Sequence, residues 1–366
     1  MNYLTRLRDL EQHLEDHRLD AFFVTHLANI RYLCGFSGSS GVLAFCRGER
    51  RFFTDGRYTE QAETQVKGAP VRVSSLPPPA HAAQWVAGRL KRSRSSRIAI
   101  EAEHTTLAMQ ARFVSELQRE IPKSRFRIVQ TGGAVEQFRI RKDAEEIAWI
   151  RRAVNLASSI FPGVIRALDA NITENDLAAE LEHLARRAGA EKMSFETIVA
   201  AGRNSALPHA RPTRGRIGRG FVLLDYGVIL GGYCSDMTRT VYAGRADKTA
   251  REIYSAVLEA QLAGISTVRP GVQAQDVDAA ARKVLRRHKL DKYFTHSLGH
   301  GVGIEIHEAP RLAKGQTQKL EAGMVITIEP GVYIPGKGGV RIEDMILVTH
   351  AGHEVLTSTP KELVIR

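Results

Sequence analysis

Hydrophobic positions in the first 130 residues alternate between helical and strand spacing. Four leucines (Leu4, Leu7, Leu10 and Leu14) recur at helical spacing and predict an amphipathic helix at the start of the chain. Short apolar runs of strand length follow, separated by helical stretches. The runs are Ala21–Thr25, Gly41–Cys46, Val71–Ser74 and Arg97–Ile100, and the helical stretches lie near 57–66, 80–92 and 104–120. This alternation predicts an α/β domain built around a largely buried sheet.

The remainder of the chain has a different pattern, which begins after a break near Thr131–Gly133. A long helix is predicted from near Lys142 and a second from Thr173, where Thr173 and Asp176 match an N-terminal capping arrangement. The predicted strands are Phe195–Ala201, Phe221–Tyr226, Tyr233–Tyr242, Gly323–Ile328 and Gly339–Val348, with helices near 247–268 and 275–288 between them. We therefore predict two domains, an α/β amino-terminal domain over 1–130 and an α+β domain over 131–366.

Composition narrows the class of protein. The chain has 366 residues, of which 43% are hydrophobic and 25% charged, the ordinary balance of a globular protein. No apolar run approaches the roughly 18 residues that span a bilayer, and the first residues lack the basic flank and apolar run of a secretory signal. Three cysteines are too few for a disulfide framework. We expect a cytoplasmic protein with reduced thiols and no membrane partner.

The net charge of +12 raises the question of nucleic-acid binding. The basic excess is spread over both halves of the chain, and its densest runs are Arg89–Arg97 and Arg211–Arg219. Neither run contains the aromatic residues on which bases stack. A solvated basic surface is the better interpretation, and we expect no nucleic-acid partner.

Four carboxylates of the second domain occupy positions that are costly for an isolated charge. Asp225 ends the apolar run FVLL and Glu329 ends MVITI, whereas Asp236 and Glu343 lie inside strand-like segments. A carboxylate embedded in an apolar strand needs a positive partner. Two divalent cations would neutralise four such charges, and with His300 as an imidazole ligand the site suits Mn, Co, Zn or Fe.

Histidines gather in the same part of the sequence. Besides His300, the second domain contains His209, His296 and His307, and three of the four fall within the segment HSLGHGVGIEIHE. Glycines in this segment let backbone approach closely. Ser297 follows His296, so the zinc-protease motif H-E-x-x-H is absent.

Three motifs of the second domain combine into a family signature. They are Asp225 and Asp236 at a spacing of eleven, the segment GHGVGIEIHE, and the segment ITIEPGVYIPGKGGVRIED. Together they resemble the "pita-bread" metallopeptidases of family M24, most closely the group of Xaa-Pro aminopeptidases and prolidases. In the first domain, LCGFSGSSGVLAF, FFTDGRYTEQA and VEQFRIRKDAEEI are similar to the amino-terminal domain and linker of that group. The resemblance implies a creatinase-like amino-terminal domain followed by a pita-bread catalytic domain.

The resemblance also implies a dinuclear metal centre. Asp236 and Glu343 would bridge two divalent metal ions, Asp225 would bind one ion, and His300 with Glu329 would bind the other. Mn²⁺ is the expected metal, with Co²⁺ or Zn²⁺ as alternatives. Glu329 would also help to pass a proton to the leaving imino nitrogen.

Further residues would contact the substrate or act in catalysis by the same resemblance. His209 and His307 would contact the scissile carbonyl oxygen and the developing oxyanion. His296 would shape the proline pocket. Arg341 would pair with one of the ligand carboxylates, with Tyr333 close by.

The first-domain segments favour an Xaa-Pro aminopeptidase that acts on proline-containing peptides. We also expect a homodimer. The alternative is an Xaa-Pro dipeptidase (prolidase), which would bind the proline carboxylate with a cation such as Arg311. The short glycine-rich loop Pro335–Gly339 suggests an open rim and thereby favours longer peptides.

Three other functions share the fold. Creatinase uses no metal, and a catalytically inactive peptide-binding module would be expected to lose metal ligands. This chain retains all five of the expected metal ligands, which argues against both. A methionine aminopeptidase would fit the ligands but would not explain residues 1–130.

Overall fold

The computed structural model describes all 366 residues, which divide into two units, Met1–Arg139 and Ile140–Arg366. The division falls later than the break in the sequence pattern at residue 130. It does so because the strand β6 (Phe126–Thr131) and the short helix α6 (Glu136–Arg139) belong to the first unit. Arg139 Nη1 donates to Asn29 Oδ1 of that unit at 2.7 Å.

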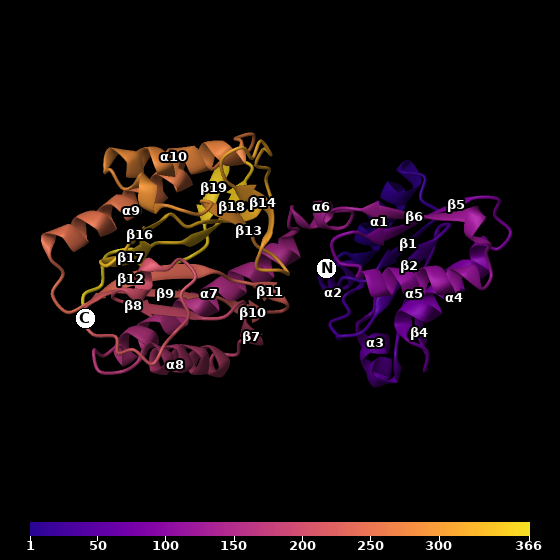
Figure 1. The fold of residues 1–366 in the computed structure, drawn as a ribbon, viewed down its shortest axis with the longest axis horizontal. Coiled ribbons are helices and arrows are strands. Elements are labelled where there is room, and N and C mark those ends of the chain that lie inside the picture. Colours follow the sequence, from indigo (N-terminus) through magenta and orange to yellow (C-terminus); the bar gives the residue numbers. More distant parts are fainter. The chain divides into compact units, whose positions relative to one another are not determined.

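The first unit is built on one six-stranded sheet in the order β4-β3-β2-β1-β5-β6 (Figure 1). Its remaining strands are β1 (Ala21–Val24), β2 (Val42–Cys46), β3 (Glu49–Thr54), β4 (Val71–Val73) and β5 (Ser96–Glu101). Its remaining helices are α1 (Tyr3–Asp16), α2 (Leu27–Cys34), α3 (Thr59–Gln65), α4 (Pro78–Leu90) and α5 (Leu107–Gln118), with 3-10 turns η1 (Gly56–Tyr58) and η2 (Lys123–Arg125). Strand β1 is antiparallel to β2 and parallel to β5. The expected α/β organisation is confirmed, and α2 is a helix that the sequence pattern did not predict.

The second unit combines two helix pairs with short sheets. The helices are α7 (Ala144–Ala167), α8 (Glu174–Arg187), α9 (Lys248–Thr267) and α10 (Ala274–Arg287), with 3-10 turns η3 (Asn204–Ala206) and η4 (Asp291–Tyr293). The strands are β7 (Lys192–Met193), β8 (Ile198–Ala201), β9 (Gly220–Tyr226), β10 (Val228–Leu230), β11 (Tyr233–Cys234), β12 (Met237–Ala243), β13 (Gly299–Gly301), β14 (Glu308–Leu312), β15 (Val325–Ile328), β16 (Gly331–Ile334), β17 (Gly338–Arg341), β18 (Asp344–Thr349) and β19 (Gly352–Val355). The expected capping arrangement is confirmed, because Thr173 Oγ1 accepts from Asp176 N at 3.1 Å at the start of α8.

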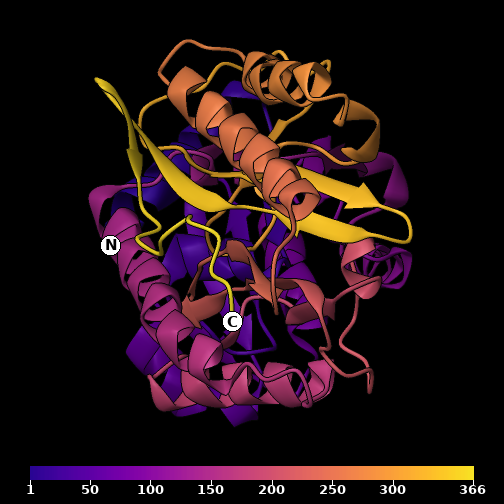
Figure 2. The same ribbon diagram turned by 90° about the vertical axis from the view of Figure 1, so that its left-hand side faces the viewer.

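Strands of this unit lie between the two helix pairs (Figures 1 and 2). Buried side chains of α9 and α10 pack with β15, β16 and β18 in one hydrophobic core. Those of α7 and α8 pack with β8, β9 and β12 in another. Apolar residues thus stabilise both sides of the strands, and the polar site described below lies among strand ends.

Two of the predicted strands are interrupted. The segment Tyr233–Tyr242 splits into β11 and β12, and Gly339–Val348 splits into β17 and β18. The breaks fall at Asp236 and Glu343, so the prediction that these carboxylates lie within continuous strands is wrong. Their backbone amides leave the regular ladder: Asp236 N donates to Met345 Sδ at 3.2 Å, and Glu343 N donates to the Thr238 carbonyl at 3.1 Å.

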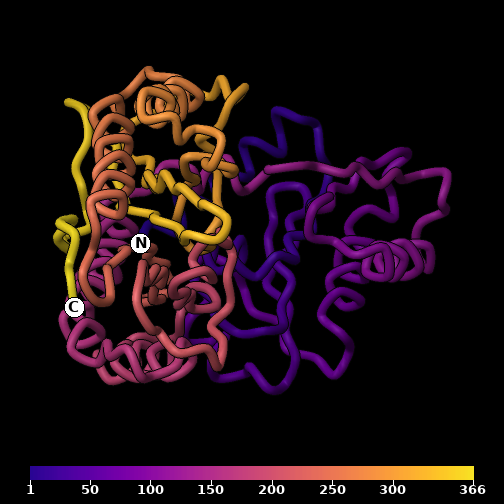
Figure 3. The backbone as a smooth tube through the Cα atoms, turned by 60° about the vertical axis from the view of Figure 1, so that its left-hand side comes forward, coloured from indigo at the N-terminus to yellow at the C-terminus, as the bar shows by residue number.

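The C-terminal segment lies along α9 within the second unit (Figure 3). Tyr254 Oη of α9 donates to the Lys361 carbonyl at 2.8 Å, and Tyr242 at the end of β12 forms a bridge with Ile365. None of the helices combines the length and the apolar composition needed to cross a bilayer.

Candidate metal centre and active site

Strand pairing in the second unit brings the four carboxylates together. In β9 and β12, Asp225 is the partner of Thr238, and in β15 and β18, Ile328 is the partner of Asp344. The ligand candidates therefore sit at or beside paired positions. Thr238 also joins the two pairs of strands, because its hydroxyl donates to Glu343 Oε2 at 2.6 Å.

A second contact fixes Glu343 through its backbone. The buried Arg239 of β12 donates from Nη1 to the Glu343 carbonyl at 2.6 Å and from Nη2 to Asp344 Oδ1 at 2.7 Å. A guanidinium offers donors in a planar fork, so a single side chain holds both neighbouring residues. These contacts fix the backbone conformation at the break between β17 and β18.

The carboxylates and His300 form one compact group. His300 Nε2 lies 3.6 Å from Asp236 Oδ2 and 3.4 Å from Glu329 Oε1. The ligand atoms of Asp236, His300 and Glu343 all lie within 4.8 Å of one another. The structure thus brings together all five of the residues for which we expect a metal-binding role, since Asp225 lines the same cavity.

Burial and like charge oppose the ionisation of Asp236, Glu329 and Glu343. Burial and then the neighbouring carboxylates, Glu343 first among them, raise the pKa of Asp236 well above its usual range. Burial and then the charge of Glu329 raise the pKa of Glu343 in the same direction. Burial also raises the pKa of Glu329 to about 8. The chain by itself therefore favours protonated carboxylates here, and ionising all of them requires added positive charge.

One positively charged side chain of the protein, Arg341, already contacts the carboxylate cluster. Arg341 Nη2 is hydrogen-bonded to Asp225 Oδ2, and Arg341 Nε donates to Thr238 Oγ1 at 3.0 Å. A single guanidinium cannot balance four carboxylates. The other oxygen, Asp225 Oδ1, is buried and has no hydrogen-bond partner. A buried acceptor without a partner is costly unless an ion or water binds it.

His300 is held in the form that binds a metal. Its Nδ1 lies 2.9 Å from the Gly301 carbonyl, an acceptor, so Nδ1 carries the proton. Burial lowers the pKa of His300 to about 4, which keeps the ring neutral. The unprotonated Nε2 then faces the carboxylates, as in metal sites where a carbonyl fixes the tautomer of the ligand.

His296 takes part in a directed chain of hydrogen bonds. Its Nδ1 donates to the Ser297 carbonyl at 2.8 Å, so its Nε2 accepts from Tyr333 Oη at 2.9 Å. Tyr333 in turn accepts from Arg341 Nη1 at 2.7 Å. Burial, and then the charge of Arg341, lowers the pKa of His296 to about 3. His296 is therefore a neutral, orientationally fixed ring and not a proton donor at neutral pH.

The group opens into a cavity of about 1100 Å³. Residues singled out from the sequence that line it are Asp225, Asp236, His300, Glu329, Glu343, His209, His296, His307 and Arg341. Tyr333 does not line the cavity and lies behind His296 and Arg341. Arg311, on β14 opposite His300, also reaches the cavity wall.

His307 and His209 are placed differently from the ligand group. The ring of His307 meets that of His300 edge to face, with 4.4 Å between centroids. Burial lowers the pKa of His307. His209 follows η3 and lies on the cavity wall. Both rings can reach a substrate in the cavity without taking part in the carboxylate cluster.

Several supporting residues were not predicted from the sequence. Arg282 of α10 donates from Nη2 to the His296 carbonyl at 2.6 Å and pairs through Nε with the buried Asp278 at 2.7 Å. Asp278 Oδ1 accepts from Leu298 N at 3.2 Å. In the sequence, Asp278 and Arg282 look like an ordinary ion pair four residues apart on a helix. That spacing does not indicate that they hold the loop carrying His296.

Comparisons with known proteins identify the family to which this chain belongs. Residues 148–350 match Metallopeptidase family M24, and residues 6–141 match the Creatinase/Prolidase N-terminal domain. The chain belongs to metallopeptidase family M24. An uncharacterized peptidase of Bacillus subtilis is 37% identical over 365 residues, 99% of each chain. The fold is accordingly a creatinase amino-terminal domain joined to a pita-bread catalytic domain.

Solved structures of the family share the whole architecture. An Xaa-Pro dipeptidase from Bacillus anthracis is 36% identical, with a TM-score of 0.92 and 100% of both chains covered. An X-Pro aminopeptidase from Thermotoga maritima is 32% identical, with a TM-score of 0.88 and 98% of this chain and 100% of that chain covered. Further structures of this fold carry the names prolidase or dipeptidase.

The residues present in this M24 chain fit the metals that the family uses. The unpartnered Asp225 Oδ1, the compact Asp236–His300–Glu343 group and the neutral His300 ring are oxygen and imidazole donors of the kind that paired divalent transition metals take. The fit concerns the donor set, and it is compatible with Mn, Co or Zn.

Proposed function

We propose that this chain is a dinuclear-metal Xaa-Pro dipeptidase, which hydrolyses the peptide bond before a carboxyl-terminal proline. The observation that carries the proposal is the cluster of the buried Asp225, Asp236 and Glu343 with the half-buried Glu329 and His300. The cluster opens to a cavity that three further histidines line. Burial opposes the ionisation of three of these carboxylates, Asp236, Glu329 and Glu343, and two divalent ions would offset that effect.

The metal-binding roles follow the donor positions. Asp225, Asp236, His300, Glu329 and Glu343 would together hold two ions, with Asp225 contributing its unpartnered oxygen. When bound, the ions would lower the pKa of water and polarise the scissile carbonyl. We propose Mn²⁺ as the metal, with Co²⁺ or Zn²⁺ as alternatives.

Side chains of the protein would stabilise the oxyanion, transfer the proton and bind proline. His307 and His209 donate hydrogen bonds to the carbonyl oxygen as negative charge develops on it. Glu329 would take a proton from the attacking water and pass it to the imino nitrogen of the leaving proline. The fixed, neutral ring of His296 forms a wall of the proline pocket. Arg341 aligns Asp225 and orients Tyr333 behind that wall.

Two observations favour a dipeptidase over the aminopeptidase that we expected from the sequence. The solved relatives named dipeptidase or prolidase include the one with a TM-score of 0.92, whereas the X-Pro aminopeptidase has 0.88. Arg311 lines the cavity, where it can bind the carboxylate of a terminal proline.

The prediction of an open rim at Pro335–Gly339 is wrong. Residues 335–337 form the tip of the β16–β17 hairpin, Gly338 and Gly339 belong to β17, and none of these residues lines the cavity. Gly338 instead lies against the backbone of Gly202 and the hydroxyl of Ser205. The turn itself is an exposed hairpin tip that does not line the cavity, so its length carries no information about peptide length.

Specificity is tested by three substrates that differ only beyond proline: Ala-Pro, its amide and Ala-Pro-Ala. We expect kcat/KM for Ala-Pro to exceed the others at least tenfold, about 1.4 kcal/mol of transition-state binding. Arg311→Ala should remove most of that preference. Lys314→Ala, an exposed cation in the same segment that does not line the cavity, should retain it. Faster cleavage of Ala-Pro-Ala would return the assignment to Xaa-Pro aminopeptidase.

A further inference from the structure

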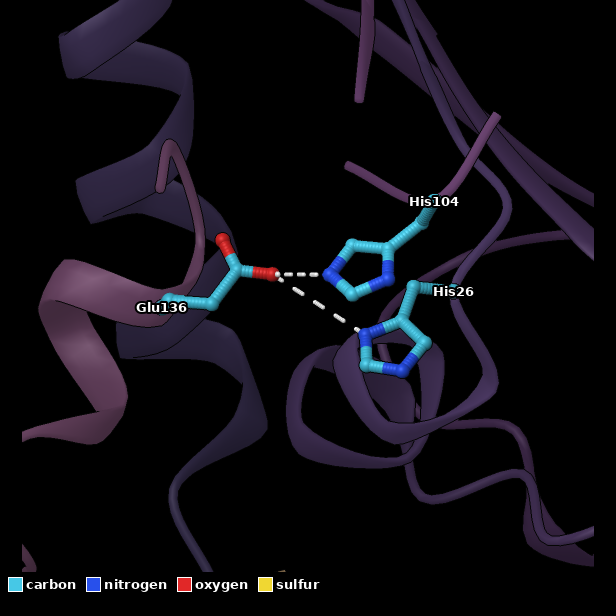
Figure 4. A group of neighbouring side chains, drawn as sticks. All are labelled: His26, His104 and Glu136. Carbon is cyan, nitrogen blue, oxygen red and sulfur yellow. Dashed lines mark hydrogen bonds and ion pairs between the residues drawn. The ribbon is translucent and has the colours of Figure 1, made fainter. Parts of the chain in front are cut away.

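The first unit contains a second group of metal-binding side chains, separate from the carboxylate cluster of the second unit. It consists of His26, His104 and Glu136, and we call it the His-His-Glu group (Figure 4). One potential ligand atom from each of the three residues lies within 4.8 Å of the other two. The peptidase chemistry proposed above uses none of these residues.

Sheet topology explains why residues so far apart in sequence meet. Strands β1 and β5 are parallel neighbours in which Ala21 pairs with Ile98. Their carboxyl ends therefore meet at one edge of the sheet. His26 follows the end of β1 and His104 follows the end of β5, so both rings lie at that edge. Helix α6, the last element of the unit, supplies Glu136.

The distances suit a metal ion after small side-chain movements. Glu136 Oε1 lies 3.1 Å from His104 Nε2 and 3.9 Å from His26 Nδ1. Zinc binds such atoms at roughly 2.0–2.2 Å in a tetrahedron, which places any two ligands about 3.3–3.6 Å apart. The two measured separations bracket that range. Figure 4 shows both nitrogens facing the same carboxylate oxygen from one side.

The rings of His26 and His104 pack directly against each other. They stack face to face, with 3.6 Å between centroids and 6° between planes. A metal ion binds an imidazole through the ring nitrogen that carries no proton. The stack therefore presents His26 Nδ1 and His104 Nε2 side by side as potential donors.

Neighbouring residues hold the carboxylate in position. Asn29 Nδ2 donates to Glu136 Oε1 at 2.6 Å, and Arg139 Nη1 donates to Asn29 Oδ1 at 2.7 Å. A carboxylate has about four lone-pair sites, so Glu136 can keep the bond from Asn29 and still bind an ion. Such supporting hydrogen bonds are a regular feature of metal sites.

We propose that the His-His-Glu group binds one divalent transition-metal ion of the zinc type. Two imidazoles and one carboxylate suit Zn²⁺ and disfavour Mg²⁺ or Ca²⁺, and Mn²⁺ binds such a set weakly. The side chains of His26, His104 and Glu136 are 19%, 26% and 27% exposed, so solvent or a further ligand can complete the coordination. The ion would join α6 to the edge of the sheet.

Zn²⁺ itself is the probe, and bound zinc per chain after equilibrium dialysis is the readout. The full-length Asp236→Asn chain, in which the second unit's metal binding is weakened, serves as the parent. We expect one tightly bound equivalent in the parent and its loss in the additional variants His26→Ala and His104→Ala. His183→Ala, which removes an exposed histidine of α8 in the second unit, should leave the stoichiometry unchanged.

A spectroscopic readout separates ligation from a folding defect. Co²⁺ bound in the parent should give the visible absorption of a four-coordinate site, which His104→Ala removes. Glu136→Gln has the same size and can still accept from Asn29, so it tests the site if a histidine variant fails to fold. The proposal is overturned if the parent binds no zinc, or if every folded variant of the group binds as many ions as the parent.

Discussion

Removing metal from the second unit should make its stability fall as the pH rises from about 5 to about 8. The folded pKa of Glu329 is about 8, against an ordinary value of 4.5. Between these values the folded chain keeps a proton that the unfolded chain releases. The stabilising contribution is complete below about pH 4.5 and is lost as the pH rises through about 8. Its slope is about 1.4 kcal/mol per pH unit, or about 3 kcal/mol between pH 4.5 and pH 7. Asp236 and Glu343 act in the same direction.

The assay is urea unfolding of the chelated full-length chain at a series of pH values. The chain has two tryptophans, and Trp149 on α7 reports the second unit because its ring lies against Gly231. A Trp85→Phe background leaves Trp149 as the sole tryptophan. Adding Mn²⁺ should reverse the trend, because bound cations favour the ionised carboxylates and bind more tightly as protons leave.

Glu329→Gln is the matched variant, since an amide of the same size does not titrate. In the metal-free state its stability should fall with a slope smaller by up to about 1.4 kcal/mol per pH unit. Metal-free stability that stays level or increases from about pH 5 to about pH 8 would refute the electrostatic account of the cluster. An unchanged slope in Glu329→Gln would refute the assignment to Glu329.

Other consequences can be checked separately. His307→Ala should retain its metals, measured by elemental analysis, yet lose on the order of a hundredfold in kcat, as expected for an oxyanion donor; normal turnover would exclude that role. Arg282→Gln should loosen the loop that carries His296, which we propose as a wall of the proline pocket, so KM for Ala-Pro should rise while metal content stays constant; an unchanged KM would show that the loop needs no such support. Burial raises the pKa of Cys34, Cys46 and Cys234 to about 12. A thiol-alkylating reagent should therefore modify them only after unfolding, and rapid labelling of the native chain would contradict their burial.

The sequence pointed to the carboxylate cluster because charge stands out against apolar runs. Asp225 and Glu329 are conspicuous at the ends of FVLL and MVITI, since a carboxylate beside a buried apolar strand is costly unless a cation binds it. The strand-like patterns around Asp236 and Glu343 hid the breaks at these two residues. Strand periodicity continues through a kink of one or two residues, and only tertiary contacts such as that of Thr238 with Glu343 show where the ladder ends.

Residues joined only by topology left no local pattern. His26, His104 and Glu136 are separated by long stretches of chain, and the pairing of β1 with β5 is what brings the two histidines together. Arg282 likewise looked like a solvated helical residue, although it bonds the carbonyl of His296. Sequence spacing predicts neighbours within an element, whereas these contacts depend on which elements pack together.

The most direct test of the central claim is hydrolysis of Ala-Pro by the chelated chain as Mn²⁺ is added back in known equivalents. If the cluster that contains Asp236 and Glu343 must hold two ions, activity should be negligible without metal. Activity should then rise with added Mn²⁺ and level off at two equivalents, as a paired site requires. The Asp236→Asn chain should show no such rise. Full activity in exhaustively chelated protein, or an equal response in Asp236→Asn, would contradict the dinuclear account.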